Sequence, residues 1–272
     1  MHKKILLPNK VRLVIAPLKE TQTTNLLVLV KVGSRQEDKK VSGGSHFIEH
    51  LMFKGTKKRP TALDISKELN GVGAEFNAFT GKDHTGYYIK SDAKHLSLSI
   101  DVLSDMLLNS QFDIKEMERE RGVIVEEINM YEDNPMMYVD DLLEQIMYSG
   151  HPLGVSVAGT RESVKKMTRA DLIGYKNKFY SGSHIVICLA GNFKEGHIGE
   201  LKSKFKFKST AKIFPLNKIS IKQKTPKVAL KFKETEQTQI ALGFPAYSYS
   251  DKRIYALQLL SIILGGNMSS RL

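Results

Sequence analysis

The sequence contains one cysteine, no tryptophan and no long run of apolar residues. The single cysteine, Cys188, excludes an intrachain disulfide and makes a reducing compartment the default expectation. No apolar run approaches the roughly 20 residues that a membrane-spanning helix needs, and Pro8 ends the first apolar stretch too early for a signal peptide. We therefore expect a cytoplasmic protein with no membrane partner. We also expect Cys188 to be a small core residue, because it lies in the apolar run 185–190.

Acidic residues are missing from one stretch, and this stretch explains the net charge of +12. Eleven of the 41 Lys and Arg residues lie between Leu201 and Lys233, a segment with no Asp, Glu or Arg. From Lys202 to Lys208 the lysines alternate with Ser and Phe, which is typical of a solvated edge strand protected against aggregation. Contact with an acidic partner is the alternative. Nucleic acid is disfavoured, because it is Arg that makes bidentate contacts to phosphate and guanine.

The remaining composition, 41% hydrophobic and 26% charged in 272 residues, is that of an ordinary globular protein. The hydrophobic pattern mixes strands and helices, which predicts an α+β fold. Strands are expected at 4–8, 11–17, 25–33, 74–80, 84–91 and 185–190. Helices are expected at 43–53, 61–70, 93–109, 114–132, 136–148, 161–167, 169–179 and 196–205, with capping boxes beginning at Thr61 and Thr168.

After the lysine-rich segment the order of elements begins again. Strands are expected at 228–233 and 237–244, followed by an apolar helix at 254–264. This order repeats that of 26–33 and 43–53 at an offset of about 214 residues, which suggests an internal repeat. We therefore predict one unit over residues 1–215 and, over 216–272, a linker and the truncated start of a second homologous unit. The second part is near the lower size limit of about 50 residues for an independent core.

Residues 46–50 read His-Phe-Ile-Glu-His, a His-x-x-Glu-His motif within an expected helix. Residues four apart share a helix face, so His46 and His50 can direct two imidazoles at one ion, with Glu49 close to a water on that ion. Zinc suits two neutral imidazoles, a carboxylate and an open position, and the carboxylate can accept a proton from the activated water. The alternative is a helix with two partly exposed histidines and a surface glutamate.

A third ligand must come from another segment, and helix 114–132 is the best donor because it contains six glutamates. Glu120 and Glu127 are two turns apart and share a face, with Glu116 near it. Glu126 lies about 100° away from Glu127 around the helix. Periodicity alone does not choose between Glu126 and Glu127 as the ligand.

The sequence from 43 to 56, Gly-Gly-Ser-His-Phe-Ile-Glu-His-Leu-Met-Phe-Lys-Gly-Thr, closely resembles the active-site helix of the insulinase/pitrilysin family of zinc metallopeptidases. The nearest branch is the bacterial and mitochondrial-processing-peptidase-like one. The resemblance continues in the family's order through 73–80, 120–128, 151–154, 190–192 and 264–272. It implies an α+β fold with a mixed, mostly antiparallel sheet and helices packed on it. Homologous units of this kind enclose a chamber, and the first of them holds one zinc ion.

The resemblance also implies roles for individual residues. His46 and His50 match the family's zinc histidines, and Glu49 matches its general base. The family's third ligand lies seven residues after the Glu of its Glu-Arg-x-Val segment, which selects Glu127. Glu120 matches a second glutamate near the site, one that orients a ligand.

Asn77 and Ala78 match a strand whose edge, in the family, pairs with an extended substrate peptide. An ordinary strand or turn position is the alternative for Asn77. In the family, a second unit adds an Arg and a Tyr that help hold the substrate, and these would follow residue 272. We therefore expect a zinc-dependent endopeptidase acting on extended peptides. The second hypothesis is a zinc- and peptide-binding half that needs a second homologous half or a partner subunit for turnover.

Overall fold

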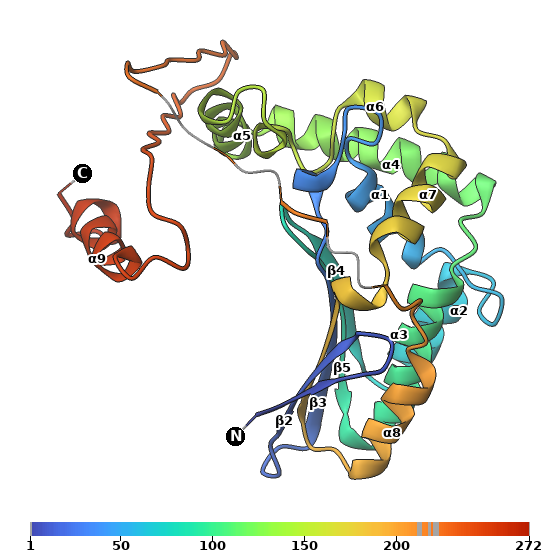
Figure 1. Cartoon of the computed structure of the whole chain (residues 1–272). Coiled ribbons are helices and arrows are strands. Elements are labelled where there is room, and N and C mark those ends of the chain that lie inside the picture. The colour runs from blue at the N-terminus through green and yellow to red at the C-terminus, as the bar shows by residue number, and fades with distance from the viewer. Residues whose placement is uncertain (1, 211–213, 217–218, 220–222, 272) are drawn as a thin grey trace.

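In the computed structural model, six strands form one mixed sheet (Figure 1). The structure describes residues 2–210, 214–216, 219 and 223–271. The strands are β1 (Lys3–Leu6), β2 (Arg12–Pro17), β3 (Thr23–Val30), β4 (Glu75–Thr80), β5 (Thr85–Asp92) and β6 (Ile185–Gly191). Their order across the sheet is β1-β2-β6-β3-β5-β4. Neighbours are antiparallel except for β2 and β6, which confirms the expected α+β class with a mostly antiparallel sheet.

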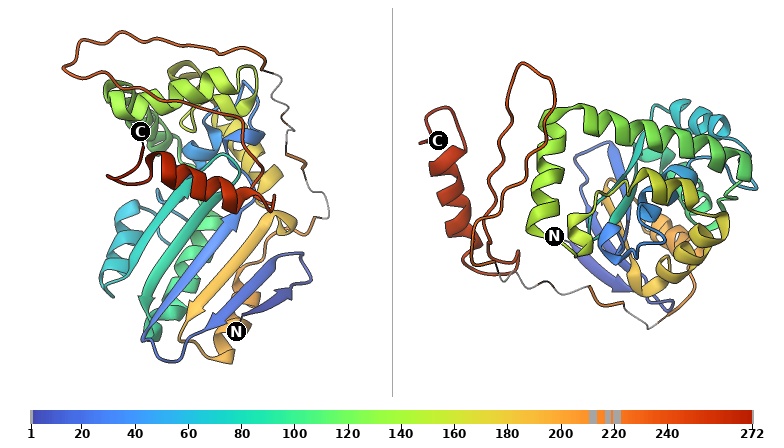
Figure 2. Two further views of the ribbon diagram at one scale, coloured as in Figure 1. Left: turned by 90° about the vertical axis from the view of Figure 1, so that its left-hand side faces the viewer. Right: turned by 90° about the horizontal axis from the view of Figure 1, so that it is seen from above.

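Alternating side chains along β3 show how the sheet divides the molecule into a helical side and an open side. Leu26, Val28 and Val30 are fully buried, whereas Leu27 and Leu29 between them are only half-buried. Successive side chains of a strand point to opposite faces, so the first three face the core. Figure 2 shows helices α3 and α8 behind the sheet and its other face turned toward the viewer.

The helices lie close to their expected positions. They are α1 (Gly44–Met52), α2 (Ala62–Asn70), α3 (Leu96–Asn109), α4 (Ile114–Asp133), α5 (Pro135–Met147), α6 (Arg161–Lys166), α7 (Arg169–Phe179), α8 (Glu195–Lys204) and α9 (Ile254–Gly265). Short 3₁₀ turns, η1 to η4, lie at Ser34–Gln36, Ala93–His95, Pro152–Gly154 and Gly182–His184. Both predicted capping boxes are present, at Thr61 before α2 and at Thr168 before α7.

The two strands predicted at 228–233 and 237–244 are absent from the described structure, so that prediction is wrong for this chain. A strand needs a partner to satisfy its backbone groups, and no strand of the described residues pairs with this segment. The Lys233 ammonium instead donates to carbonyl oxygens of Glu132 and Asp133 at the end of α4, and Gly243 lies beside Leu143 and Met147 of α5. The predicted helix at 254–264 is confirmed as α9, because a helix satisfies its hydrogen bonds internally.

Two further predictions need correction. Lys202 and Lys204 lie in α8, and the stretch from 205 to 208 forms no strand, although Phe205 and Phe207 are buried and Lys206 and Lys208 are exposed. Cys188 is half-buried on the open face of β6 and is not part of the core. Part of the predicted linker (217–218 and 220–222) lies outside the described residues, and the unit boundary at 215 stays a prediction. No described helix is long and apolar enough to span a bilayer.

Candidate metal centre

The motif 46–50 lies on α1, a nine-residue helix that is packed deep in the fold. Phe47, Ile48 and Leu51 are buried and anchor one side of α1. The opposite side carries both histidines one turn apart, and the two Nε2 atoms of His46 and His50 are 3.3 Å apart. Two ring nitrogens at this separation converge on one point, as expected from the spacing of the motif.

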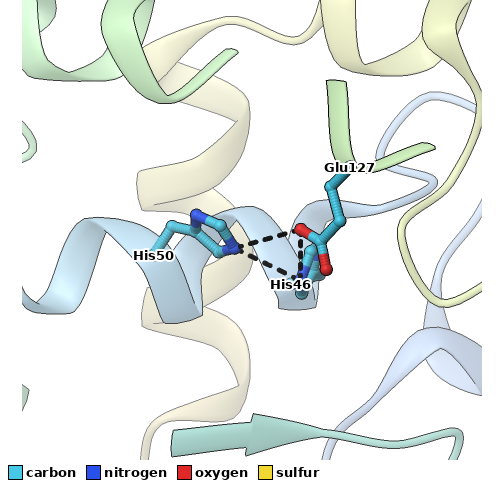
Figure 3. Close-up of side chains that lie close together, drawn as sticks. All are labelled: His46, His50 and Glu127. Atoms are coloured by element: carbon cyan, nitrogen blue, oxygen red, sulfur yellow. Dashed lines mark hydrogen bonds and ion pairs between the residues drawn. The ribbon is translucent and has the colours of Figure 1, made fainter. Parts of the chain in front are cut away.

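Glu127 reaches the same point from α4 (Figure 3). Its Oε2 atom lies 3.6 Å from Nε2 of His46 and 3.6 Å from Nε2 of His50. Within the described part of the chain, these three residues are the one group of His, Cys, Asp and Glu side chains close enough to hold a metal ion, with ligand atoms within 4.8 Å of one another. Glu126 is exposed and accepts a hydrogen bond from Asn129, so of the two glutamates left open by periodicity only Glu127 reaches the histidines.

Glu120 lies behind His50, also on α4. The residue is only 3% exposed. Oε2 of Glu120 is 3.0 Å from Nδ1 of His50, and its other oxygen is 2.7 Å from the Lys54 ammonium. Burial alone would raise the pKa of Glu120, but the hydrogen bonds from His50 and Lys54 outweigh it and lower the pKa. An ionised Glu120 accepts the Nδ1–H of His50, which leaves the Nε2 lone pair of His50 free to bind a metal.

His46 is held in its neutral form. Burial, reinforced by the nearby His50, lowers its pKa to about 4. A metal-binding imidazole must be neutral, so this environment suits a ligand. The Nδ1 atom of His46 is buried and has no hydrogen-bond partner among the described residues. Nε2 is therefore the ring nitrogen of His46 that contacts other polar groups of the described chain, namely Glu127 and His50.

Two neutral imidazoles and one carboxylate, converging from two helices, are the donor set of a catalytic zinc site with positions left for water or substrate. The residues present therefore fit a zinc ion. Three carboxylates, those of Glu49, Glu120 and Glu127, lie on or beside the two histidines, and the one Lys or Arg that pairs with any of them in the described structure is Lys54. A bound dication would balance this excess of negative charge.

Glu49 lies next to His50 and is half-buried. Burial raises the pKa of its carboxyl group, and a hydrogen bond from the Thr80 hydroxyl counteracts part of that rise. Thr80 is the last residue of β4, so this contact joins α1 to the end of one strand.

Asn77 and Ala78 lie on β4, which is the outermost strand of the sheet next to β5. The N–H of Ala78 donates to Oδ1 of Asn77 at 2.8 Å. Gly81 donates to His84 across the turn between β4 and β5, and hydrogen-bonded pairs alternate along an antiparallel ladder, so the Ala78–Tyr87 pair is a non-hydrogen-bonded one. This backbone donor therefore belongs to the free edge of the sheet.

Thr80 and Lys54 were not predicted from the sequence as contacts of these residues. Lys54 is four residues after His50, so the same helical spacing that links His46 to His50 could have indicated it. Thr80 could not be inferred by spacing, because its contact with Glu49 joins segments that are 31 residues apart.

Comparison with known proteins agrees with this arrangement. Residues 12–161 match the insulinase family, peptidase family M16, and residues 166–272 match the peptidase M16 inactive domain. The chain is 37% identical over 273 residues to YmxG of Bacillus subtilis, named an uncharacterized zinc protease, and 36% identical to a protein of Streptomyces coelicolor with the same description. These alignments include 100% and 98% of this chain but only 66% and 59% of the relatives' own lengths.

Solved structures point the same way. The crystal structure of a protease from Helicobacter pylori superposes with a TM-score of 0.74 and 25% identity, over 82% of this chain and 54% of that one. The fold, the order of the motifs and the family match over more than half of the chain all assign the chain to the same family. The chain belongs to the insulinase family of peptidases, peptidase family M16.

Proposed function

We propose that this chain is the zinc-binding catalytic unit of a metalloendopeptidase that hydrolyses extended peptides. The observation that carries the proposal is the convergence of His46, His50 and Glu127, with Glu49 beside them. These three residues would hold one zinc ion per chain. When bound, zinc acts as a Lewis acid that acidifies water and polarises a peptide carbonyl.

Glu49 would accept the proton of the attacking water and pass it to the leaving amine. Its half-buried position and raised pKa suit a group that must take up and release a proton near neutral pH. The Thr80 hydroxyl holds the Glu49 carboxylate by one oxygen, Oε2, and leaves the other free to face a substrate.

The free edge of β4 would bind the peptide as an added strand. Main-chain hydrogen bonds supply affinity in this mode, and the substrate backbone is drawn out into a cleavable, extended form. The Ala78 N–H is one such donor, and the Asn77 side chain occupies it until a peptide carbonyl takes its place. Because β4 ends at Thr80, a peptide that pairs with it passes next to Glu49.

Turnover would require a second homologous unit or a partner subunit. Two observations support this part of the proposal. Leu230 and Phe232 are each 91% exposed, and α9 is apolar around most of its circumference although it is exposed. Surfaces of this kind are normally covered by another part of a protein. The match of residues 166–272 to the inactive domain of the family also fits a two-part enzyme.

Metal analysis and peptide turnover test the proposal. The purified chain should contain one zinc ion by elemental analysis. A fluorogenic peptide should be cleaved by the chain together with an added second homologous unit, and a chelator should abolish cleavage. Cleavage that persists after complete removal of metal would contradict the proposal, as would a chain that takes up no zinc.

A further inference from the structure

The metal helix α1 does not cap its own N-terminus. Its N-cap residue, Gly43, has φ +88°, a left-handed conformation that side chains disfavour. A Cβ atom on Gly43 would lie 2.4 Å from the carbonyl oxygen of Ala158, so no larger residue fits. The position that usually supplies a capping oxygen is therefore restricted to glycine, and the first N–H groups of α1 must find an acceptor elsewhere.

Glu37 supplies that acceptor from the loop after η1. One carboxylate oxygen accepts from the Gly43 N–H and the other from the Ser45 N–H, each at 2.7 Å. Both bonds are short, as is usual for a charged acceptor, and the carboxylate lies at the positive end of the helix dipole. Ser45 directly precedes His46, so this contact fixes the turn of α1 that carries the first histidine.

The ionised carboxylate of Glu37 lowers the stability of the folded state. The residue is 7% exposed, and within the described part of the chain no Lys, Arg or His forms an ion pair with it. The groups that act on it are the N–H groups of Gly43 and Ser45, the Ser45 hydroxyl, the adjacent Asp38 and Tyr175 of α7, and burial raises its pKa to about 7. Buried charges without a partner oppose stability, and where they occur they commonly serve a site.

We propose that Glu37 is a positioning residue of the metal centre, which holds the first turn of α1 so that His46 and His50 converge on the ion. The inference rests on the proposed zinc function. The hydrogen bonds of Glu37 come from the N–H groups of Gly43 and Ser45 and not from the ligand side chains, so it would act through the backbone of α1.

Glu37→Gln tests this proposal. The amide keeps one acceptor oxygen but presents an NH₂ group to the second backbone N–H, so the first turn of α1 loses one of its two anchors. Zinc affinity, measured by competition with a chromophoric chelator, should weaken by about tenfold or more, the scale seen when groups that orient ligands are removed. The absorption spectrum of the cobalt(II)-substituted chain should also change, because it reports the geometry around the metal.

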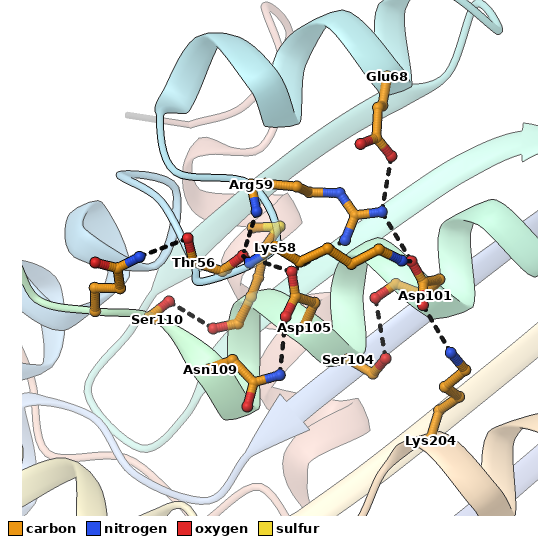
Figure 4. Close-up of polar contacts among 12 residues, drawn as sticks. Thr56, Lys58, Arg59, Glu68, Asp101, Ser104, Asp105, Asn109, Ser110 and Lys204 are labelled. Carbon is orange, nitrogen blue, oxygen red and sulfur yellow. Dashed lines mark hydrogen bonds and ion pairs between the residues drawn. The ribbon is translucent and has the colours of Figure 1, made fainter.

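Asp105→Asn is the matched control. Asp105 is equally buried, at 7%, and accepts hydrogen bonds from Thr56 and Arg59 in a separate cluster of polar residues (Figure 4). This variant removes a buried carboxylate that lies away from the N-terminus of α1. It should lower the unfolding free energy but keep the wild-type zinc affinity and cobalt spectrum.

The outcomes separate this inference from the function on which it rests. A wild-type chain that binds no zinc would overturn both. A wild-type chain that binds zinc, with Glu37→Gln binding it equally well, would overturn the role of Glu37 and leave the metal centre intact. Equal losses of zinc affinity in Glu37→Gln and Asp105→Asn would also overturn it, because stability alone would explain the effect.

If Glu37→Gln does not fold, Glu37→Asp replaces it. The shorter side chain keeps the charge but cannot span both N–H groups, and the zinc affinity of this variant should fall.

Discussion

Nδ1 of His50 lies 3.0 Å from a carboxylate oxygen of Glu120, and this contact determines which nitrogen of His50 is free for a metal. The second oxygen of Glu120 pairs with Lys54, a residue of the loop that follows α1. The side chains of His50, Glu120 and Lys54 thus link the candidate metal centre to the end of α1.

Glu120→Gln should weaken zinc binding by about ten- to a hundredfold, because a neutral amide accepts the Nδ1–H of His50 less strongly. Glu118→Gln, on the same helix but exposed and paired with Arg121, should leave zinc affinity unchanged. Competition titration with a chromophoric chelator measures both. Equal affinities for the two variants would show that Glu120 does not orient His50.

Glu49→Gln should keep one bound zinc ion but lower peptide hydrolysis by about a thousandfold, because the proton acceptor is lost while the ligands remain. His50→Ala should lose both the zinc and the activity. Elemental analysis and turnover of a fluorogenic peptide, with the second homologous unit added, distinguish the two variants. Full activity of zinc-loaded Glu49→Gln would exclude Glu49 as the base.

Glu127→Gln and Glu126→Gln differ by one position on α4 and should behave differently. Glu127 faces the histidines, so its replacement should weaken zinc binding by more than about a hundredfold, the upper range for residues that only orient a ligand. Glu126 is exposed, so its replacement should change nothing. Zinc content after dialysis against a weak chelator is the measurement, and the reverse order of the two variants would refute the assignment.

Arg59→Met should lower the unfolding free energy by about 3 kcal/mol or more. The Arg59 side chain is 2% exposed and binds Asp101, Asp105 and Glu68, so its loss leaves the buried Asp105 carboxylate without a cation. Lys58→Met removes a cation that also pairs with Asp101 but is 58% exposed, and should lower the unfolding free energy by less than about 1 kcal/mol. Urea denaturation compares the two, and similar losses would mean that burial is not the deciding factor.

Stability should depend on pH through Glu37. Its folded-state pKa of about 7 lies above the ordinary value of 4.5, so the folded state binds the proton more tightly than the unfolded state. The unfolding free energy contributed by this group is therefore present below the unfolded pKa and is lost as pH rises through about 7, by up to about 3 kcal/mol.

Glu37→Gln removes this titration. Urea denaturation of the metal-free wild type and variant, at about pH 5 and about pH 8, should show the wild type losing more stability than the variant as pH rises. Parallel pH profiles would mean that burial does not shift the pKa of Glu37.

Much of the fold was predictable because its signals are local. The capping pairs at Thr61 and Thr168 and the apolar periodicity of α3, α4 and α9 arise from residues within one or two turns of each other. The strands predicted at 228–244 failed for the opposite reason. Their pattern favours a strand, but a strand forms only where a partner backbone is present. Cys188 was misplaced because an apolar run alone does not say which face of β6 points to the core.

The sequence by itself determined the pair of imidazoles and the adjacent carboxylate, because helix geometry places His46, Glu49 and His50 within one turn. The tertiary structure decided which residues from distant segments of the chain come into contact. It brought Glu127 rather than Glu126 to the histidines, left the β4 edge free, and placed Glu37 at the start of α1. The physical reason is that periodicity specifies which residues share a face, whereas only packing specifies what that face meets.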